Sequence, residues 1–484
     1  MAKIKVGSTA SFQAGLTRRI KAKGDDPIRH FARHLFADLS LTDLNQRRWE
    51  DVTATVKSCW KFYSEFDGSK SQIRILPGTG AYLVIEIAST NLPFLLESLR
   101  MELSQLNLVL ADVQQCRMGV IRHEKKMVLT DEIEANESLI RLEIKSAGAP
   151  ADLESRLLRI IGFVQRVVTD YTALRQQMLL WSNDAELNTA SVEIGNLLKW
   201  FHDNNFTFLG YEEFRPDRKE LKIVRKSRLG LARPGKSADG IPVSVPEGTI
   251  KIEKMPVRSK VHRPVYVDSV TICERSDGDI VRLGRFLGLF TSSVYTENPN
   301  EIPVVRQKIA DIFASFDFVP SSHKGRELAR ILEILPREEL FFATDEDLSQ
   351  LASHILALQE RRIVRVLVRQ DSYFANCIVY VPKDTYNTSI RVQIQKILVS
   401  TFSATDVEFS TYFSESALTR THFVLRLEKP VEVDLALLEQ QVTELTRSWA
   451  DFFQESICEV HDEDEAARLF EIYRDRKSVG RERV

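Results

Sequence analysis

Apolar side chains recur at three- and four-residue spacing from Asp26 to Trp60. That period places them on one face of a helix, so the pattern predicts two or three amphipathic helices. Residues 81–88 (AYLVIEIA) form an apolar, β-branched run after a cluster of turn formers, which predicts a buried strand. Pro93 suits the first turn of a helix, because its φ is fixed, and we expect this helix to reach Leu106.

The segment that follows has the pattern of an α+β sandwich. Strands are predicted over 108–114, 119–123 and 138–145, and a long helix is predicted over 152–181. The order β-α-β-β-β-α on a four-stranded antiparallel sheet is close to the ferredoxin-like fold.

The next region, about 185–315, predicts a mixed α/β unit with a large antiparallel hairpin. The Asp277-Gly278 pair between the last two strands is typical of a two-residue hairpin turn. The predicted strands cover 206–214, 221–226, 265–274 and 280–290, between a helix that ends at Trp200 and a helix over 303–316.

The third region repeats the α+β architecture with little identity of letters. Residues 361–369 (RRIVRVLVR) alternate basic and apolar side chains, which is typical of a strand with one solvated face. Helices are predicted over 324–335, 345–360, 387–402 and 435–459, and further strands over 375–381, 407–413 and 422–427. We interpret the two sandwiches as a structural repeat.

Composition excludes several classes of protein. A chain of 484 residues holds two to four domains, and a formal charge of -2 excludes a polybasic nucleic-acid binder. The longest apolar stretches are far shorter than the ~18 residues of a membrane helix, so we expect a soluble protein. Five scattered cysteines without a C-x-x-C pair indicate reduced thiols in the cytoplasm. The basic start resembles a transit peptide in composition, but we expect a disordered segment.

Two motifs suggest anion binding, and both have a simpler interpretation. Residues 230–237 (GLARPGKS) satisfy the letters of a P-loop, but the residues that follow cannot form the helix that a phosphate site needs. The segment 215–236 holds nine Lys/Arg but no aromatic side chain for base stacking. We expect a solvated loop, or ion pairs with the acidic region 428–471, and no nucleic-acid partner.

Candidate chemistry is sparse elsewhere. His30 and His34 have the i, i+4 spacing of a zinc pair, but no third ligand is apparent, so we predict no metal site. His262, Asp268 and Ser269 lack the strained elbow of a nucleophile, so we expect structural roles for them. Ser98 lies near the start of a predicted helix, where free N–H groups favour a carboxylate ligand.

Several segments, in order along the chain, resemble the large NAD-specific glutamate dehydrogenases of bacteria. They are NLPFLLES (91–98), NESLIRLE (136–143), NFTFLGY (205–211), HRPVYVDS (262–269), RFLGLFTSSVY (285–295), IPVVRQK (302–308), LPREELF (335–341) and VYVPKDTYNTSIR (379–391). Eight ordered matches over most of the chain are not expected by chance.

The resemblance implies two ACT-like sandwiches that flank a PAS-like mixed α/β domain, with connecting helices. The expected divisions are a disordered start (1–25), helices and the first ACT-like domain (26–182), the PAS-like domain (183–318), a helical connector (319–360), the second ACT-like domain (361–460) and a truncated tail (461–484). ACT domains commonly bind amino acids between copies, so a homo-oligomer and an amino-acid effector are implied. Asn91, where the family usually has Asp, and Ser98 are the candidate effector residues.

The resemblance also implies the chemistry of the parent protein, which would oxidise L-glutamate to 2-oxoglutarate and ammonia with NAD. No catalytic or cofactor-binding residue is expected in this chain, because the family's catalytic part would begin further downstream. We therefore expect a regulatory and oligomerisation portion that is inactive by itself and ends in a truncated reading frame. The alternative is a stand-alone amino-acid-sensing or scaffold protein of ACT-like and PAS-like modules.

Overall fold

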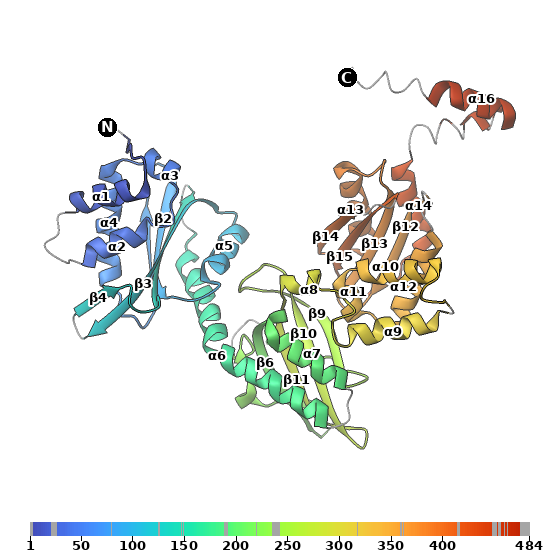
Figure 1. The fold of residues 1–484 in the computed structure, drawn as a ribbon, viewed down its shortest axis with the longest axis horizontal. Coiled ribbons are helices and arrows are strands. Elements are labelled where there is room, and N and C mark those ends of the chain that lie inside the picture. Colours follow the sequence, from blue (N-terminus) through green and yellow to red (C-terminus); the bar gives the residue numbers. More distant parts are fainter. Residues whose placement is uncertain are drawn as a thin grey trace.

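Three antiparallel sheets follow one another along the chain in the computed structural model (Figure 1). The structure describes residues 3–474, apart from 21–26, 79, 124–125, 147, 149, 188–191, 219, 235–242, 317, 359–360, 362, 414–416, 448–452, 454–455, 459 and 462. The predicted α+β class is confirmed, because every strand pair in this described part is antiparallel and each sheet is packed against helices.

The first sheet has five strands in the order β1-β2-β5-β3-β4. These are β1 (Gln72–Pro77), β2 (Tyr82–Thr90), β3 (Val109–His123), β4 (Lys126–Thr130) and β5 (Glu137–Lys145). One face packs on α5 (Leu95–Gln105) and α6 (Leu153–Leu187) through side chains such as Ile85 and Leu142. The other face, with Cys116 and Leu139, is covered by the N-terminal helices. Those helices are α1 (Thr9–Arg19), α2 (Pro27–Leu35), α3 (Leu41–Gln46) and α4 (Trp49–Ser64).

The prediction for this part needs three corrections. Residues 3–20 are not disordered: α1 buries Phe12 and Leu16 in the N-terminal core, because its apolar positions are one turn apart. The two strands predicted over 108–123 form the single strand β3. The sheet has five strands because β1 and β4 are short pieces with weak patterns, which are stabilised by pairing with β2 and β3.

The second sheet runs β7-β6-β11-β10-β9, with β8 paired to β6. Its elements are α7 (Val192–Trp200), a π-helical turn (Phe201–Asn205), β6 (Phe206–Asp217), β7 (Glu220–Ile223), a 3-10 turn (Arg225–Ser227), β8 (Leu229–Gly230), β9 (Ile250–Arg258), β10 (Tyr266–Ser276), β11 (Asp279–Phe290), α8 (Ser292–Thr296) and α9 (Val305–Ser315). The predicted hairpin is confirmed: Asp277 and Gly278 both have positive φ, and Ser276 pairs with Asp279. Strand β9 was missed.

The third sheet runs β12-β13-β15-β14 and also has helices on both faces. Its strands are β12 (Arg365–Gln370), β13 (Phe374–Pro382), β14 (Asp406–Phe413) and β15 (Leu418–Arg426). The helices on its faces are α10 (His323–Ile334), α11 (Arg337–Phe342), α12 (Asp345–Leu358), α13 (Thr388–Phe402) and α14 (Leu435–Thr446). Helix α16 (Glu463–Arg474) follows them and lies apart from this sheet in Figure 1. The last ten residues of the expected truncated tail, 475–484, lie outside the described residues.

Helix α6 connects the first two sheets. It spans 35 residues, or about 52 Å at 1.5 Å per residue. Its N-terminal part contributes Leu157 and Val164 to the core of the first sheet. Its C-terminal part places Trp181 against the second sheet, where the indole Nε1 donates to the Tyr211 hydroxyl at 2.9 Å.

Gly230, the first residue of the P-loop letters, has a structural role. Its φ is +60°, and a Cβ at this position would lie 2.2 Å from the Leu209 carbonyl oxygen. Its N–H donates to Asp170 of α6 at 2.7 Å, and the Arg233 guanidinium donates to the same carboxylate at 2.5 and 2.7 Å. These Arg233 hydrogen bonds lower the pKa of Asp170. An internal carboxylate therefore holds the start of this segment.

The basic segment 215–236 makes its ion pairs locally. In the described residues, Lys222 pairs with Asp217, Arg233 with Asp170, and Arg228 with Glu212. The expected pairing with the acidic region 428–471 is not among these contacts, because β6 and α6 already supply carboxylates nearby.

We expect Gly230→Ala to destabilise the protein by about 2 to 3 kcal/mol, through strained backbone and the clash with the Leu209 carbonyl. The measurement is the midpoint of urea unfolding, with circular dichroism as the signal. Gly248→Ala is the matched control, since a Cβ there meets nothing within 4 Å. Equal midpoints for the two variants would contradict the role given to Gly230.

Candidate functional site

The two predicted effector residues have structural partners. Ser98 is fully buried on α5; its Oγ donates to the Phe94 carbonyl at 2.6 Å and accepts from the His262 N–H at 3.1 Å. Asn91 Nδ2 donates to the Ala135 carbonyl at 2.9 Å. Ser98 thus joins the first sheet to the loop before β10. A role for Asn91 and Ser98 in effector binding stays a prediction.

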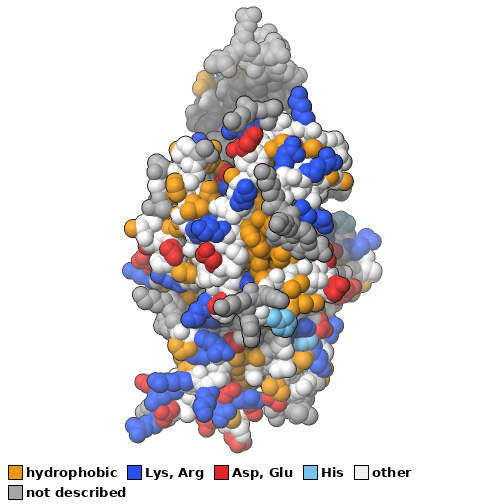
Figure 2. Space-filling view, turned by 90° about the vertical axis from the view of Figure 1, so that its left-hand side faces the viewer, with side chains coloured by type: hydrophobic (Ala, Val, Ile, Leu, Met, Phe, Trp, Pro, Cys, Tyr) orange, Lys and Arg blue, Asp and Glu red, His pale blue; other side chains and the backbone are white. Residues whose placement is uncertain are grey.

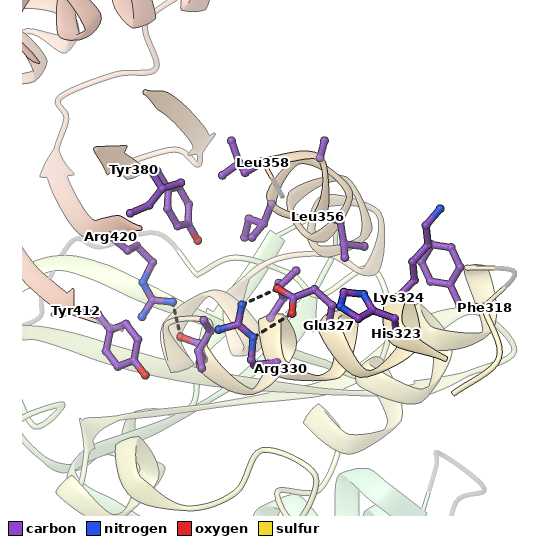
Figure 3. A pocket seen from close by; sticks show the side chains of 15 residues that line it. Phe318, His323, Lys324, Glu327, Arg330, Leu356, Leu358, Tyr380, Tyr412 and Arg420 are labelled. Carbon is purple, nitrogen blue, oxygen red and sulfur yellow. Dashed lines mark hydrogen bonds and ion pairs between the residues drawn. The ribbon is translucent and has the colours of Figure 1, made fainter. Parts of the chain in front are cut away.

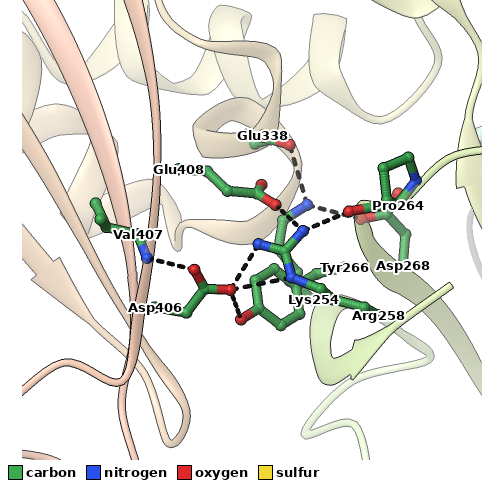
Figure 4. A network of polar contacts seen from close by, with 9 residues as sticks. All are labelled: Lys254, Arg258, Pro264, Tyr266, Asp268, Glu338, Asp406, Val407 and Glu408. Atoms are coloured by element: carbon green, nitrogen blue, oxygen red, sulfur yellow. Dashed lines mark hydrogen bonds and ion pairs between the residues drawn. The ribbon is translucent and has the colours of Figure 1, made fainter. Parts of the chain in front are cut away.

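Asp268 is part of a buried ion cluster between the second and third sheets (Figure 4). The ammonium of Lys254 on β9 lies 3.3 Å from Asp268 Oδ1 and 3.1 Å from Oε1 of Glu338 on α11. Asp268 Oδ2 also accepts from the Phe290 N–H at 3.2 Å. Burial alone would lower the pKa of Lys254. The negative charges of Asp268 and Glu338 raise it by more, so the net shift of the pKa is upward. Burial raises the pKa of Asp268 despite the opposing Lys254 charge.

Arg258 extends this contact to the edge of the third sheet (Figure 4). Its guanidinium binds Asp406 on β14 at 2.6 and 3.0 Å and Glu408 at 2.8 Å. The Tyr266 hydroxyl donates to the same Asp406 oxygen at 2.7 Å, and Arg258 stacks on the Tyr266 ring. We call Lys254, Arg258, Asp268, Glu338 and Asp406 the latch. From the 262–269 segment, Asp268 belongs to the latch and Tyr266 contacts it.

A cavity of about 580 Å³ lies between the third sheet and helices α10 and α12 (Figure 3). Its polar lining comes from α10 and from the third sheet, and its apolar wall includes Ile331 and Leu356. The polar side chains are His323, Lys324, Glu327, Arg330, Tyr380, Tyr412 and Arg420. We call this cavity the third-sheet pocket. Neither Asn91 nor Ser98 lines it.

Two neighbouring groups in the pocket are suited to an acidic ligand. The Tyr380 hydroxyl is buried next to the Arg420 guanidinium. Burial raises its pKa, although the Arg420 charge opposes this. Arg420 donates to the Ile334 carbonyl and stacks on Tyr412, and no described carboxylate lies within ion-pair distance of it. Arg420 and the adjacent Tyr380 hydroxyl therefore offer a buried cation and an O–H donor to a ligand carboxylate.

The same pocket also has an acidic group. Glu327 on α10 pairs with Arg330 at 2.6 and 3.1 Å, and Figure 3 shows this pair between the Arg420 end and the Lys324 end. A second cavity, of about 420 Å³, lies near β12, but its arginines are already paired: Arg369 with Glu339 and Arg365 with Glu439. The third-sheet pocket is therefore the better candidate for a charged ligand.

Sequence patterns did not identify these groups. Tyr380 falls in a predicted strand and was interpreted as part of a sheet, whereas Arg420 lies just before a predicted strand and was given no role. They become a candidate site because α10 and α12 cover this face of the sheet. These helices lie 22 to 97 residues before Tyr380 and Arg420 in the sequence, so only tertiary packing brings them together. The only local signal is Tyr380 within the 379–391 match.

Two antiparallel sandwiches, joined by helices and a third antiparallel sheet, define a multi-module protein of the ACT type. Three family models match the chain: glutamate dehydrogenase ACT1 domain over 31–157, helical motif 1 over 302–361 and ACT2 domain over 365–450. The chain belongs to the NAD-specific glutamate dehydrogenase family, as the resemblance indicated. The PAS-like character of the second sheet stays a prediction.

Curated relatives agree with this family. NAD-specific glutamate dehydrogenase of Pseudomonas aeruginosa is 34% identical over 95% of this chain, and that of Halomonas elongata is 33% identical over 92%. The protein of the same name from Mycobacterium tuberculosis is 30% identical over 62%. The chain spans 31%, 30% and 20% of the length of these relatives. No helix in the described residues is long and apolar enough to cross a membrane.

We expect Lys254→Met to destabilise the protein by about 3 to 5 kcal/mol, because it leaves Asp268 and Glu338 buried without their cation. Protonation relieves such carboxylates, and burial has already raised the pKa of Asp268. The loss should therefore shrink as the pH falls from about 7 toward 4. Urea unfolding across this pH range measures it.

Lys251→Met is the matched control on the same strand. Lys251 is half exposed and pairs only with Glu253, at 3.1 Å, so its removal should change the free energy of unfolding by less than about 1 kcal/mol. A similar loss for both variants, or a Lys254→Met loss that does not depend on pH, would count against the latch.

Proposed function

We propose that this chain is the regulatory and assembly portion of an NAD-dependent glutamate dehydrogenase. The whole protein would convert L-glutamate, NAD and water to 2-oxoglutarate, ammonia and NADH in the cytoplasm. The names of the relatives support the reaction, and five free cysteines agree with a reducing compartment. The family matches to two ACT domains carry the regulatory assignment.

NAD does not fit the described part of the chain. Dinucleotides bind where a glycine-rich turn joins a parallel strand to a helix N-terminus. All strand pairs in the described residues are antiparallel, and the glycine at the start of the P-loop letters is bound by Asp170. We therefore assign NAD to the parent enzyme, derive no catalytic step through this chain and propose that it is inactive by itself. The domain divisions given above remain part of this proposal.

We further propose that an amino acid is the effector and that the third-sheet pocket binds it. Arg420 and the Tyr380 hydroxyl would hold the carboxylate, and Glu327 would hold the ammonium group, exchanging part of its pairing with Arg330. Ile331 and Leu356 supply an apolar wall for the side chain. A ligand here contacts both the sheet and its helical cover, so its binding would stabilise their docked arrangement.

Self-association would use β14, the edge strand of the third sheet. Phe409, Tyr412 and Phe413 are between 42% and 60% exposed on this strand. An unpaired edge with large apolar side chains favours pairing with another strand. A second copy of the same edge would bury these side chains and satisfy the free backbone groups. On the face shown in Figure 2, acidic and basic side chains are interspersed, which gives no support to nucleic-acid binding there.

In thermal unfolding, L-glutamate or L-aspartate should raise the melting temperature of the chain in a concentration-dependent way. Arg420→Met should abolish this shift, and Tyr380→Phe, which keeps the ring, should weaken binding roughly fivefold by removing one hydrogen bond. Arg365→Met, at a cation already paired with Glu439, is the control and should respond like the unchanged chain.

The same samples should form no NADH from glutamate and NAD. Glutamate-dependent NADH formation would overturn the inactive regulatory assignment. No response to any L-amino acid, or an equal response in Arg420→Met, would overturn the effector site. 2-Oxoglutarate, which lacks the ammonium group, should bind more weakly if Glu327 contributes as proposed.

Phe413→Ser should weaken self-association by at least about tenfold, because burial of a phenylalanine contributes about 1.5 to 3 kcal/mol. Sedimentation velocity over a range of protein concentrations measures the change. Tyr82→Ser, at an exposed aromatic on a strand paired on both sides, is the control. A monomeric unchanged chain, or equal weakening by both substitutions, would refute the edge-strand interface.

A further inference from the structure

Helix α2 and the turn after β4 bring three ligand-type side chains together. His30 and His34 lie one turn apart on α2, and their Nε2 atoms are 3.1 Å apart. Asp131 lies just beyond β4, and its Oδ1 is 3.2 Å from His30 Nε2 and 3.1 Å from His34 Nε2. The three atoms therefore form a nearly equilateral triangle.

Hydrogen bonding accounts for only part of this triangle. Each imidazole Nε2 carries at most one proton, and an ionised carboxylate only accepts. If both rings donate to Asp131, their Nε2–H groups face each other at 3.1 Å without an acceptor between them. If one ring donates to the other, it has no proton left for Asp131. In either case, one of the three short contacts lacks a matched donor and acceptor.

A metal ion satisfies all three contacts at once. Zinc bonds to histidine nitrogen and carboxylate oxygen at about 2.0 to 2.2 Å. Such bonds place neighbouring ligand atoms roughly 3.3 Å apart at tetrahedral angles and roughly 2.9 Å apart at right angles. The observed sides of 3.1 to 3.2 Å lie between these values. Two histidines and one carboxylate are also a common ligand set for divalent transition metals.

The surroundings position the ligands without blocking access. Phe31 and Leu35 are buried in the N-terminal core and fix the rotation of α2, which leaves His30 and His34 at its partly exposed edge. Thr130 pairs with Gly119 and accepts from the Glu132 N–H at 3.1 Å, which orders the turn that carries Asp131. Arg33, the neighbouring cation on α2, is exposed to solvent, which screens its charge.

We propose that His30, His34 and Asp131 bind one divalent transition-metal ion of the zinc class, with water at the open positions. The ion joins α2, which covers one face of the first sheet, to the turn between β4 and β5 on that sheet. Sequence patterns predicted no metal site, because the third ligand lies 97 residues from His34. The metal site does not depend on the proposed function.

Isothermal titration calorimetry, with Zn²⁺ added to the chain, should give one site per chain. The chain should carry no affinity tag. Asp131→Asn is the decisive variant, because the Asp131 side chain is 73% exposed and its replacement should leave the fold intact. Asp131→Asn and His34→Ala should each lower the affinity by more than about tenfold, since even partners outside the ligand set typically contribute this much. His354→Ala, at an exposed histidine on α12, should leave binding unchanged.

Two further measurements separate a coordinated ion from surface binding. Zn²⁺ should raise the melting temperature of the unchanged chain but not that of Asp131→Asn. Co²⁺ should produce a visible absorption band that is lost in His34→Ala. Absence of Zn²⁺ binding, binding that persists in Asp131→Asn, or a loss that His354→Ala shares would overturn the proposal.

Discussion

Helix α6 is the constraint on which the arrangement of the first two sheets depends. Because its 35 residues form one uninterrupted helix, the first sheet and the second sheet cannot turn independently about it without losing packing on one of them. Ser98 adds a second fixed point through the His262 backbone, and Asp170 adds a third by holding Gly230 and Arg233. The helix therefore contributes side chains to two cores, that of the first sheet and that of the second.

The third sheet is covered by helices on both faces, which buries its apolar side chains. Strands β13 and β15 are buried along nearly their whole length, because α13 and α14 pack on one face and α10 to α12 on the other. A ligand cannot reach an open sheet face in such a structure. It can bind only at a seam between a sheet and its helices, which is where the third-sheet pocket lies.

Sequence patterns predicted the parts of the fold that local signals determine. The Asp277-Gly278 turn and the long helix α6 are examples, since turn chemistry and apolar period act over a few residues. Strand β9 (IKIEKMPVR) was missed because charged side chains interrupt its apolar pattern, and its pairing with β10 is non-local. Tyr380 with Arg420, and His34 with Asp131, are brought together by tertiary packing, so spacing along the chain carries no signal for either site.

Charge pairing distinguishes the candidate sites from the structural framework. Buried arginines such as Arg285 and Arg369 have carboxylates, Glu212 and Glu339, which compensate the cost of removing them from water. Arg420 is similarly buried, but its described partners are a backbone carbonyl, the Tyr380 hydroxyl and an aromatic ring, which stabilise a cation less than a carboxylate does. A ligand anion would give Arg420 the kind of partner that Arg285 and Arg369 have within the chain. The pocket therefore has the chemistry of the effector site proposed above, whereas α6 joins the first two sheets and the latch joins the second sheet to the third.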